Sequence, residues 1–118
     1  MCSPQEVHWI HERYHPLLEK IKNAHPGVPV LVLNLQDAGA KLDKIMPKNL
    51  TVIHDEIKRI YDVEVAAGNN NLWYIDGKEI IGGSSGFDLT IDRVHPHQGG
   101  FYRYAGKLTP VIEEMLGI

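Results

Sequence analysis

The stretch Val28-Pro29-Val30-Leu31-Val32-Leu33 constrains the fold of this chain more than any other. It is a short, continuous apolar run rich in β-branched residues, which is typical of a strand buried on both faces. An amphipathic helix follows, from Pro47 or Asn49 to about Asp62, and Asn71–Asp76 has the pattern of a second strand. Strand, helix and strand over this length form a βαβ unit. We therefore predict an α/β fold with parallel strands and a right-handed crossover.

Two further amphipathic helices are predicted, one near each end of the chain. Ser3-Pro4-Gln5-Glu6 has the pattern of an N-cap and a capping box, so a helix is expected from here to about Asn23. Pro16 removes an internal hydrogen bond, which predicts a kink or a split into two shorter helices. The other helix is expected from about Gln98 to Leu116, packed on the sheet by one apolar face. The residues on that face are Phe101, Tyr104, Ala105, Leu108, Ile112, Met115 and Leu116.

A sheet of two parallel strands is a poor free-standing structure, because a pair of strands is marginal by itself. Val30 and Val32 need a neighbouring strand, or their edge stays open to association. We therefore predict a single domain, residues 1–118, that is incomplete on its own and is part of a larger α/β domain. A truncated reading frame, a cut chain, one of two complementing chains and a self-pairing homodimer all fit this expectation.

The composition argues against nucleic acid as a partner and against a membrane-spanning segment. The chain has 118 residues, of which 43% are hydrophobic and 23% charged, as expected for a soluble globular domain. Twelve basic against fifteen acidic residues, without a basic block, argue against nucleic acid as a partner. No apolar run approaches the roughly 20 residues that span a bilayer, and Met1-Cys2-Ser3-Pro4 begins no signal peptide. The single cysteine excludes an internal disulfide, and nothing indicates a cellular compartment.

Asp92-Arg93-Val94-His95-Pro96 is the strongest candidate for chemistry. An acid three residues before a histidine can accept the Nδ1 proton of the imidazole, which fixes one tautomer and leaves the other nitrogen free to act as a general base. Pro96 favours an extended backbone at His95. The stretch is expected after a strand and before a helix, at the sheet edge where doubly wound folds assemble active sites. The alternative interpretation is a surface turn in which Asp92 caps the backbone.

A histidine pattern near the amino terminus raises the question of a metal. His8, His11 and His15 recur along one side of the first helix, with Cys2 nearby, and imidazoles one helical turn apart can bind zinc. No HExxH pattern and no convergent carboxylate accompany them in the sequence. Solvated histidines beside an apolar stripe are the expected interpretation, so we predict no metal and no cofactor.

Two loops and two aromatic residues are weaker candidates for ligand binding or catalysis. The loop 36–40 follows a strand, where α/β proteins often contact ligands, but a plain solvated connection is the favoured interpretation. Ser84 and Ser85 lie near the Asp-His stretch in sequence, and a mobile Gly-Ser loop explains them better than a nucleophile does. Trp73 and Tyr74, on the second strand, are expected in the core rather than in a ligand platform.

The carboxyl-terminal third of the chain resembles a known family. The run from Asp92 to Phe101, continuing through Tyr104-Ala105, Leu108 and Thr109-Pro110-Val111-Ile112, resembles the last block and closing helix of the SGNH (GDSL-type) hydrolases. In that family the block reads Asp-x-x-His-Pro, and a glycine follows five residues after the histidine, as Gly100 does here. The segment 24–30 is similar to the segment before the family's fourth strand, so the resemblance covers nearly the whole chain.

The resemblance implies a flavodoxin-like, three-layer α/β fold and hydrolysis of an ester or acyl bond through an acyl-enzyme. His95 would be the general base that takes a proton from a serine, and Asp92 the carboxylate that orients the imidazole and stabilises its charged form. The family's nucleophile block and its two oxyanion-hole blocks are missing from these 118 residues. The only serines are Ser3, Ser84 and Ser85. The resemblance therefore implies that this chain is the carboxyl-terminal part of an SGNH hydrolase-like α/β domain. It would contribute the Asp-His pair and would be inactive alone.

The resemblance also implies a small-molecule ester as the substrate, such as a lipid or an acetylated sugar. The expected partner is a second copy of the chain or a complementing chain. The alternative function is of another class: a non-catalytic α/β module that self-associates, or binds a partner, through its open sheet edge.

Overall fold

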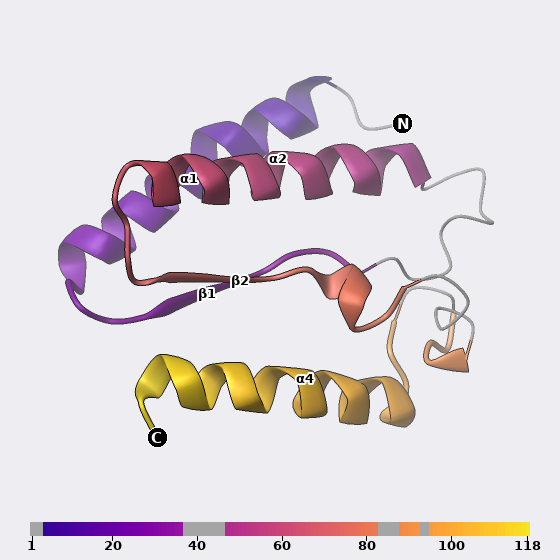
Figure 1. Cartoon of the computed structure of the whole chain (residues 1–118). Helices are drawn as coiled ribbons and strands as arrows, with labels where there is room; N and C mark the ends of the chain where they lie inside the picture. Colours follow the sequence, from indigo (N-terminus) through magenta and orange to yellow (C-terminus); the bar gives the residue numbers. More distant parts are fainter. Residues whose placement is uncertain (1–3, 37–46, 83–87, 93–94) are drawn as a thin grey trace. The chain divides into compact units, whose positions relative to one another are not determined.

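The computed structural model describes residues 4–36, 47–82, 88–92 and 95–118 (Figure 1). Along the chain the elements are α1 (Pro4–Ala24), β1 (Val30–Leu33), α2 (Pro47–Ala66), β2 (Leu72–Ile75), the 3₁₀ helix η2 (Gly77–Glu79) and α4 (Gln98–Leu116). β1 and β2 pair in one parallel sheet, with α2 between them in sequence. The predicted α/β class and the βαβ unit are therefore confirmed.

The chain divides into two compact units. One comprises Met1–Asn34 and Lys48–Tyr74, and the other comprises Leu35–Pro47 and Ile75–Ile118. The first unit thus contains α1, β1, α2 from Lys48 onward and β2 up to Tyr74, and the second contains η2, the Asp-His stretch and α4. That both units belong to a single domain stays a prediction.

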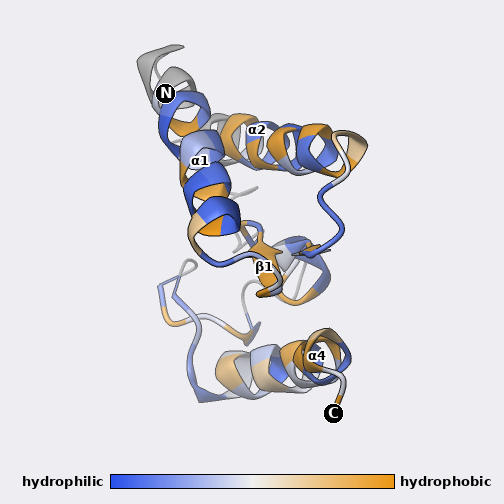
Figure 2. Cartoon of the chain, turned by 90° about the vertical axis from the view of Figure 1, so that its left-hand side faces the viewer, coloured by the Kyte–Doolittle hydropathy of each residue, from blue (hydrophilic) through white to orange (hydrophobic). Residues whose placement is uncertain are grey.

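The core of the first unit lies where α1 and α2 cover one face of the sheet (Figure 1). Its buried members are Leu18, Val32, Ile57, Ile60 and Leu72. Apolar residues at helical spacing give each helix one apolar stripe, which Figure 2 shows as hydrophobic segments interleaved with hydrophilic ones. Burying each of these side chains contributes on the order of 1.5–3 kcal/mol. Because the apolar stripes of α1 and α2 pack together, polar residues beside the stripes are brought into contact. Two such contacts, around His11 and His15, are described below.

α1 continues through Pro16 as a single helix, so the predicted alternative of two shorter helices is wrong. Pro16 is exposed, while Tyr14 and Leu18 continue the apolar stripe on either side of it. The packing of that stripe compensates for the single donor that proline lacks. The helix ends before Gly27, whose φ of 88° lies in the left-handed region that glycine enters without strain.

β1 is shorter than the apolar run, since Pro29 precedes its first residue. Val32 is 1% exposed but Leu33 is 42% exposed. The prediction of a strand buried on both faces is therefore wrong at this end of β1. Alternate side chains of a strand point to opposite faces, and α1 and α2 cover the face toward which Val32 points.

The other elements of the first half depart little from the expectation. α2 ends at Ala66, one turn beyond the predicted end. The helical turn expected after Asp76 is η2, capped by the Asp76 carboxylate, which accepts a hydrogen bond from the backbone N–H of Lys78 at 2.9 Å. The predicted loops fall largely on residues 37–40 and 83–86, which lie outside the described residues.

No helix within the described ranges is both long and apolar enough to span a bilayer.

α4 has the predicted bounds, and its predicted apolar face is right only in part. Its least exposed side chains are Tyr104, Leu108, Val111 and Met115, whereas Phe101 and Leu116, assigned to the apolar face, are 62% and 58% exposed. Tyr104, Leu108 and Met115 were assigned to that face, so the prediction is right for them and wrong for Phe101 and Leu116. The predicted packing of α4 on the sheet stays a prediction.

Candidate active site

The Asp-His stretch lies at the tip of a small antiparallel loop in the second unit. Thr90 and Pro96 form an isolated antiparallel bridge. The N–H of Ile91 donates to the carbonyl of His95 at 2.9 Å, and the N–H of His97 donates to the carbonyl of Leu89 at 3.0 Å. The strand predicted before the motif is β2, and the bridge is an additional pairing that the sequence did not predict. These backbone hydrogen bonds join the segment before Asp92 to the segment that begins at His95.

Asp92 contacts both the backbone and the ring of His95. Its Oδ1 accepts from the N–H of His95 at 2.7 Å, and its Oδ2 lies 2.5 Å from the ring Nδ1. The contact predicted from the spacing is therefore present, together with the backbone cap of the alternative interpretation. Both side chains are open to solvent, since 52% of Asp92 and 75% of His95 is exposed.

This geometry selects one tautomer of a neutral ring. A carboxylate can only accept, so Nδ1 of His95 carries the proton in the contact with Asp92. Nε2 then has a free lone pair, and among the described residues it has no hydrogen-bond partner. An imidazole held in this way can take a proton from a hydroxyl at Nε2, while Asp92 stabilises the charged ring that results.

His97 and Gly100, which follow the Asp-His stretch, hold the preceding loop against the start of α4. His97 is the N-cap of the helix, and its Nδ1 accepts from the N–H of Gly99 at 2.9 Å. Its Nε2 hydrogen-bonds to the backbone carbonyl of Asp88, across the loop. A Cβ on Gly100 would lie 2.5 Å from the carbonyl oxygen of Leu89 and 2.8 Å from Cβ of Pro96. The loop and the first turn of α4 therefore pack as one piece.

An open, largely apolar groove of about 630 Å³ lies beside this loop. Its lining residues are Ile91, Pro96, His97, Gln98, Phe101, Tyr102 and Ala105. Ile91 and Pro96 directly flank the Asp-His tip, while Phe101 and Tyr102 are strongly exposed on α4. The groove thus begins at the two residues adjacent in sequence to Asp92 and His95, although His95 is not among its lining residues.

A buried polar residue ends β1, at the carboxyl edge of the sheet. Asn34 is 2% exposed, and its side-chain amide donates to the carbonyl of His54 at 2.8 Å and to the hydroxyl of Tyr74 at 2.9 Å. The ring of Tyr74 packs 4.9 Å from that of Tyr61, as expected for a core aromatic. Sequence reasoning missed Asn34. An amide directly after a buried strand was the available signal.

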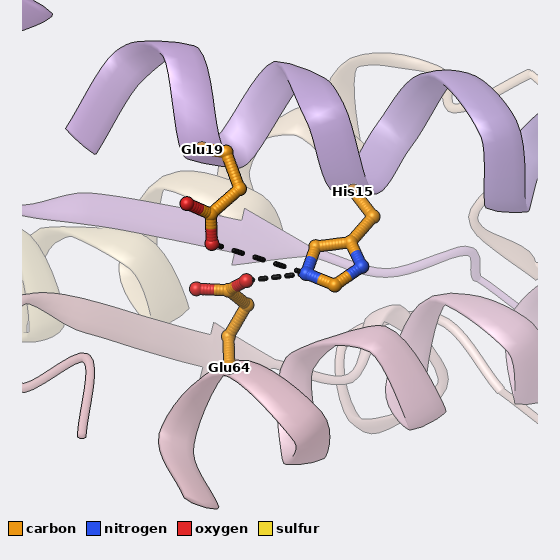
Figure 3. Close-up of side chains that lie close together, drawn as sticks. All are labelled: His15, Glu19 and Glu64. Carbon is orange, nitrogen blue, oxygen red and sulfur yellow. Dashed lines mark hydrogen bonds and ion pairs between the residues drawn. The ribbon is translucent and has the colours of Figure 1, made fainter. Parts of the chain in front are cut away.

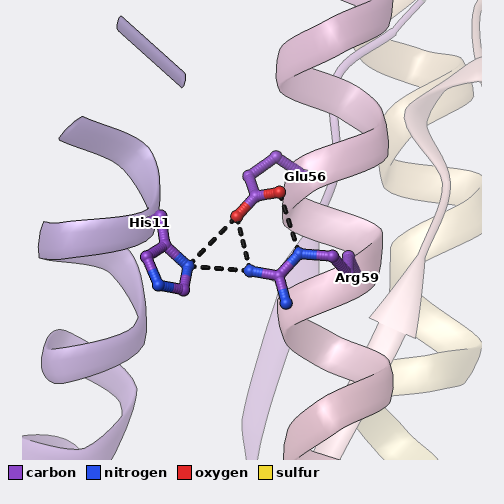
Figure 4. Close-up of polar contacts among 3 residues, drawn as sticks. All are labelled: His11, Glu56 and Arg59. Atoms are coloured by element: carbon purple, nitrogen blue, oxygen red, sulfur yellow. Dashed lines mark hydrogen bonds and ion pairs between the residues drawn. The ribbon is translucent and has the colours of Figure 1, made fainter. Parts of the chain in front are cut away.

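His11 contacts an arginine and a glutamate of α2. The guanidinium of Arg59 donates to both carboxylate oxygens of Glu56, at 2.6 and 2.9 Å, and lies 2.7 Å from Nδ1 of His11 (Figure 4). The hydrogen bonds from Arg59 hold the pKa of Glu56 below its ordinary value of 4.5, against the effect of burial. Of the other two histidines in the predicted set, His15 contacts a different cluster, and the side chain of His8 lies outside the described residues.

His15 meets two carboxylates, Glu19 on its own helix and Glu64 on α2 (Figure 3). Nε2 of His15 lies 2.5 Å from Oε1 of Glu64 and 4.0 Å from Oε1 of Glu19. A hydrogen bond to Glu64 raises the pKa of Glu19. Burial acts to raise the pKa of Glu64, but hydrogen bonds from Glu19, Asn69 and His15 together outweigh it and lower that pKa.

Sequence reasoning missed this cluster as well. His15 and Glu19 stand four residues apart on one helix, and Glu64 continues the apolar stripe of α2 four residues after Ile60. An acid within an apolar stripe is the signal that could have found it. The partner across the helix interface is a tertiary contact that no local pattern encodes.

Comparison with known proteins agrees with the fold. The family model described as the GDSL-like lipase/acylhydrolase family matches residues 2–113. A search of curated proteins found no match. Among solved structures, one described as a GDSL-like lipase from Bacteroides ovatus is similar with a TM-score of 0.79 and 24% identity, over 98% of this chain and 33% of that one.

A second similar structure is the salicylyl-acyltransferase SsfX3 from a tetracycline biosynthetic pathway. Its TM-score is 0.75 at 17% identity, over 96% of this chain and 34% of that one. The chain thus spans about a third of the length of the solved structures it matches. Since the family model covers nearly all of its residues, the chain belongs to the GDSL-like lipase/acylhydrolase family.

Proposed function

We propose that this chain supplies the acid-base half of a serine esterase or acylhydrolase site. The observation that carries the proposal is the contact of Asp92 with Nδ1 of His95, which leaves Nε2 open. Family membership supports an acyl-transfer chemistry. The serine would come from a segment other than the described residues, either in the same polypeptide or in a complementing chain.

The proposed reaction has two halves. Nε2 of His95 takes the proton of the serine hydroxyl as its oxygen attacks the ester carbonyl, and Asp92 stabilises the imidazolium. The ring then returns the proton to the leaving alcohol, and an acyl-enzyme remains. Water attacks that acyl group in the second half and gives a proton to Nε2, which passes it to the serine oxygen as the bond to the acyl group breaks and the acid is released. An alcohol in place of water would make the same site an acyltransferase.

The groove lined by Ile91 and Pro96 supports an ester with an apolar acyl group as the substrate. Ile91 and Pro96 connect the groove to the Asp-His tip, and Phe101 and Tyr102 offer aromatic surface along α4. An acyl chain in contact with these residues would bury apolar area at about 25 cal/mol per Å². Lipid esters fit this surface better than acetylated sugars do.

The test is hydrolysis of p-nitrophenyl acetate by a polypeptide that joins these 118 residues to a segment bearing a Gly-Asp-Ser-like block. His95→Ala is expected to lower kcat/KM by about 10³-fold or more, and Asp92→Asn by about 10²- to 10⁴-fold. His25→Ala removes an exposed histidine of the first unit and serves as the matched control. The 118 residues alone are expected to be inactive. Equal rates for the wild type and His95→Ala would remove the proposed role.

One observation favours the alternative function, a module that associates through its sheet. Within the described residues the sheet has only two strands, so each strand lacks a neighbour on one side. A second copy or a complementing chain could add a strand there. The two functions are compatible, because a complementing chain that completes the sheet could also bring the serine.

A further inference from the structure

Three ligand groups of two chemical kinds converge between α1 and α2 in the first unit. They are the imidazole of His15 and the carboxylates of Glu19 and Glu64, and their ligand atoms all lie within 4.8 Å of one another. Figure 3 shows both carboxylates directed at the same ring nitrogen. We propose that these three side chains bind one divalent transition-metal ion, with Zn²⁺ as the reference ion.

The donor set has the composition that such ions prefer. One imidazole nitrogen with carboxylate oxygens is a ligand set known for zinc, which binds both at about 2.0–2.2 Å. Tetrahedral coordination at that bond length places ligand atoms roughly 3.3 Å apart. The separations of 2.5 Å from His15 to Glu64 and 4.0 Å from His15 to Glu19 lie on either side of this value. Small rotations of the side chains suffice to admit the ion.

The scaffold orients the ligands. His15 and Glu19 are four residues apart, so they share one face of α1. Glu64 projects from α2, and its Oε2 accepts from the side-chain amide of Asn69 at 3.3 Å, which leaves Oε1 toward the site. An outer hydrogen bond of this kind fixes a ligating carboxylate. The side chain of Glu19 is 46% exposed, so the ion can enter from solvent and a water can fill its fourth position.

The charge balance differs from that of the neighbouring cluster on the same two helices. There the guanidinium of Arg59 supplies the positive charge between Glu56 and His11 (Figure 4). Of the residues that the structure describes, no lysine or arginine is paired with Glu19 or Glu64. Lys22 attracts Glu19 only from a longer distance. A bound cation would supply the positive charge that Arg59 supplies in the neighbouring cluster. It would also link α1 to α2, because its ligands come from both helices.

The test is Zn²⁺ binding to the tag-free chain at neutral pH, measured by calorimetry, with Co²⁺ as a spectroscopic substitute. One ion per chain is expected to bind, to raise the melting temperature and to give Co²⁺ the visible absorption of a tetrahedral site. Glu19→Gln and His15→Asn are each expected to weaken binding by about tenfold or more, the equivalent of 1.4 kcal/mol. Because Glu19 is half exposed, its variant should keep the fold, which circular dichroism would verify.

Two control variants, and a variant of the neighbouring His11 cluster, show whether Zn²⁺ binds at the proposed site. Glu113→Gln and His25→Asn remove an exposed carboxylate and an exposed imidazole elsewhere, and both should bind Zn²⁺ as the wild type does. The proposal is overturned if no ion binds, or if Glu19→Gln binds as tightly as the wild type. It is also overturned if only His11→Ala removes binding, since the ion would then occupy the other cluster. These readouts do not depend on esterase activity.

Discussion

At the scale of single residues, the site depends on contacts that a short motif can encode and on others that it cannot. The three-residue spacing of Asp92 and His95 predicted their hydrogen bond, because both groups lie in one turn. Glu64 was not predicted, since its partner His15 is 49 positions away in sequence. Local geometry is therefore readable from the sequence, whereas the pairing of side chains across helices requires the packed structure.

A substitution at Gly100 tests how closely the loop before α4 packs against the helix. Gly100→Ala is expected to destabilise the chain by about 1–3 kcal/mol, because its Cβ would lie 2.5 Å from the carbonyl oxygen of Leu89. Gly106→Ala is the matched control in the same helix, where a Cβ meets nothing within 4 Å. That change should stabilise the chain by about 0.5–1 kcal/mol through helix propensity. Urea unfolding measures both, and effects of the same sign would contradict the packing described here.

At the scale of elements, the positions of the helices and strands followed from periodicity. So did the buried faces of α1 and α2, whose Leu18, Ile57 and Ile60 lie in the core. The face of α4 followed only in part, because Phe101 and Leu116, which are apolar and were assigned to it, are exposed. Hydrophobic periodicity alone does not tell which apolar residues of a helix find a partner in the packed structure.

The N-cap of α4 is an element whose loss should be measurable. His97→Ala is expected to cost about 0.5–2 kcal/mol, because the N–H of Gly99 loses its acceptor. His97→Asn keeps a capping oxygen and should recover most of that stability, although it cannot reach the carbonyl of Asp88 in the same way. Chemical denaturation of the two variants compares them. Equal losses would show that the imidazole acts through the bridge to Asp88 alone.

The link between α1 and α2 at Glu56 predicts a dependence of stability on pH. The hydrogen bonds from Arg59 lower the pKa of Glu56 in the folded state. A lowered pKa stabilises the fold above the unfolded value, near 4.5, and this contribution is lost as the pH falls through the lower folded value. Glu56→Gln should therefore be less stable than the wild type at neutral pH, by up to about 1 kcal/mol for a partly exposed pair.

Comparing the stability of the wild type and Glu56→Gln at acid pH is the control for this prediction. The difference in unfolding free energy between the wild type and Glu56→Gln should shrink once the pH falls well below 4.5. A difference that stays constant from neutral to acid pH would mean that Glu56 stabilises the helices by packing instead of charge.

At the scale of the whole chain, two strands leave backbone groups of the sheet without a neighbouring strand among the described residues. The N–H of Val30 donates to the carbonyl of Asn71, on the side of β2. Alternate residues of a parallel strand direct their backbone groups to opposite sides, so the N–H of Leu31 points to the other edge. That edge is where we expect a second copy or a complementing chain to pair.

Sedimentation velocity tests this expectation. The chain should associate in a concentration-dependent manner, and Leu31→Pro should shift it toward the monomer, because proline removes an N–H from the outer edge without removing a bond to β2. Leu33→Ser, which changes an exposed side chain of the same strand but keeps its N–H, is the control. A wild type that is monomeric at all concentrations would contradict association through the edge.

The proposed acid-base role of His95 requires one tautomer of its imidazole, and long-range ¹H–¹⁵N NMR of the chain measures that tautomer directly. At a pH at which the ring is neutral, we predict that Nδ1 carries the proton and Nε2 the lone pair, because Asp92 accepts from Nδ1. Asp92→Asn should reduce this preference while the loop keeps its backbone hydrogen bonds. A ring protonated mainly at Nε2 in the wild type, or one indifferent to Asp92, would contradict the proposed acid-base pair.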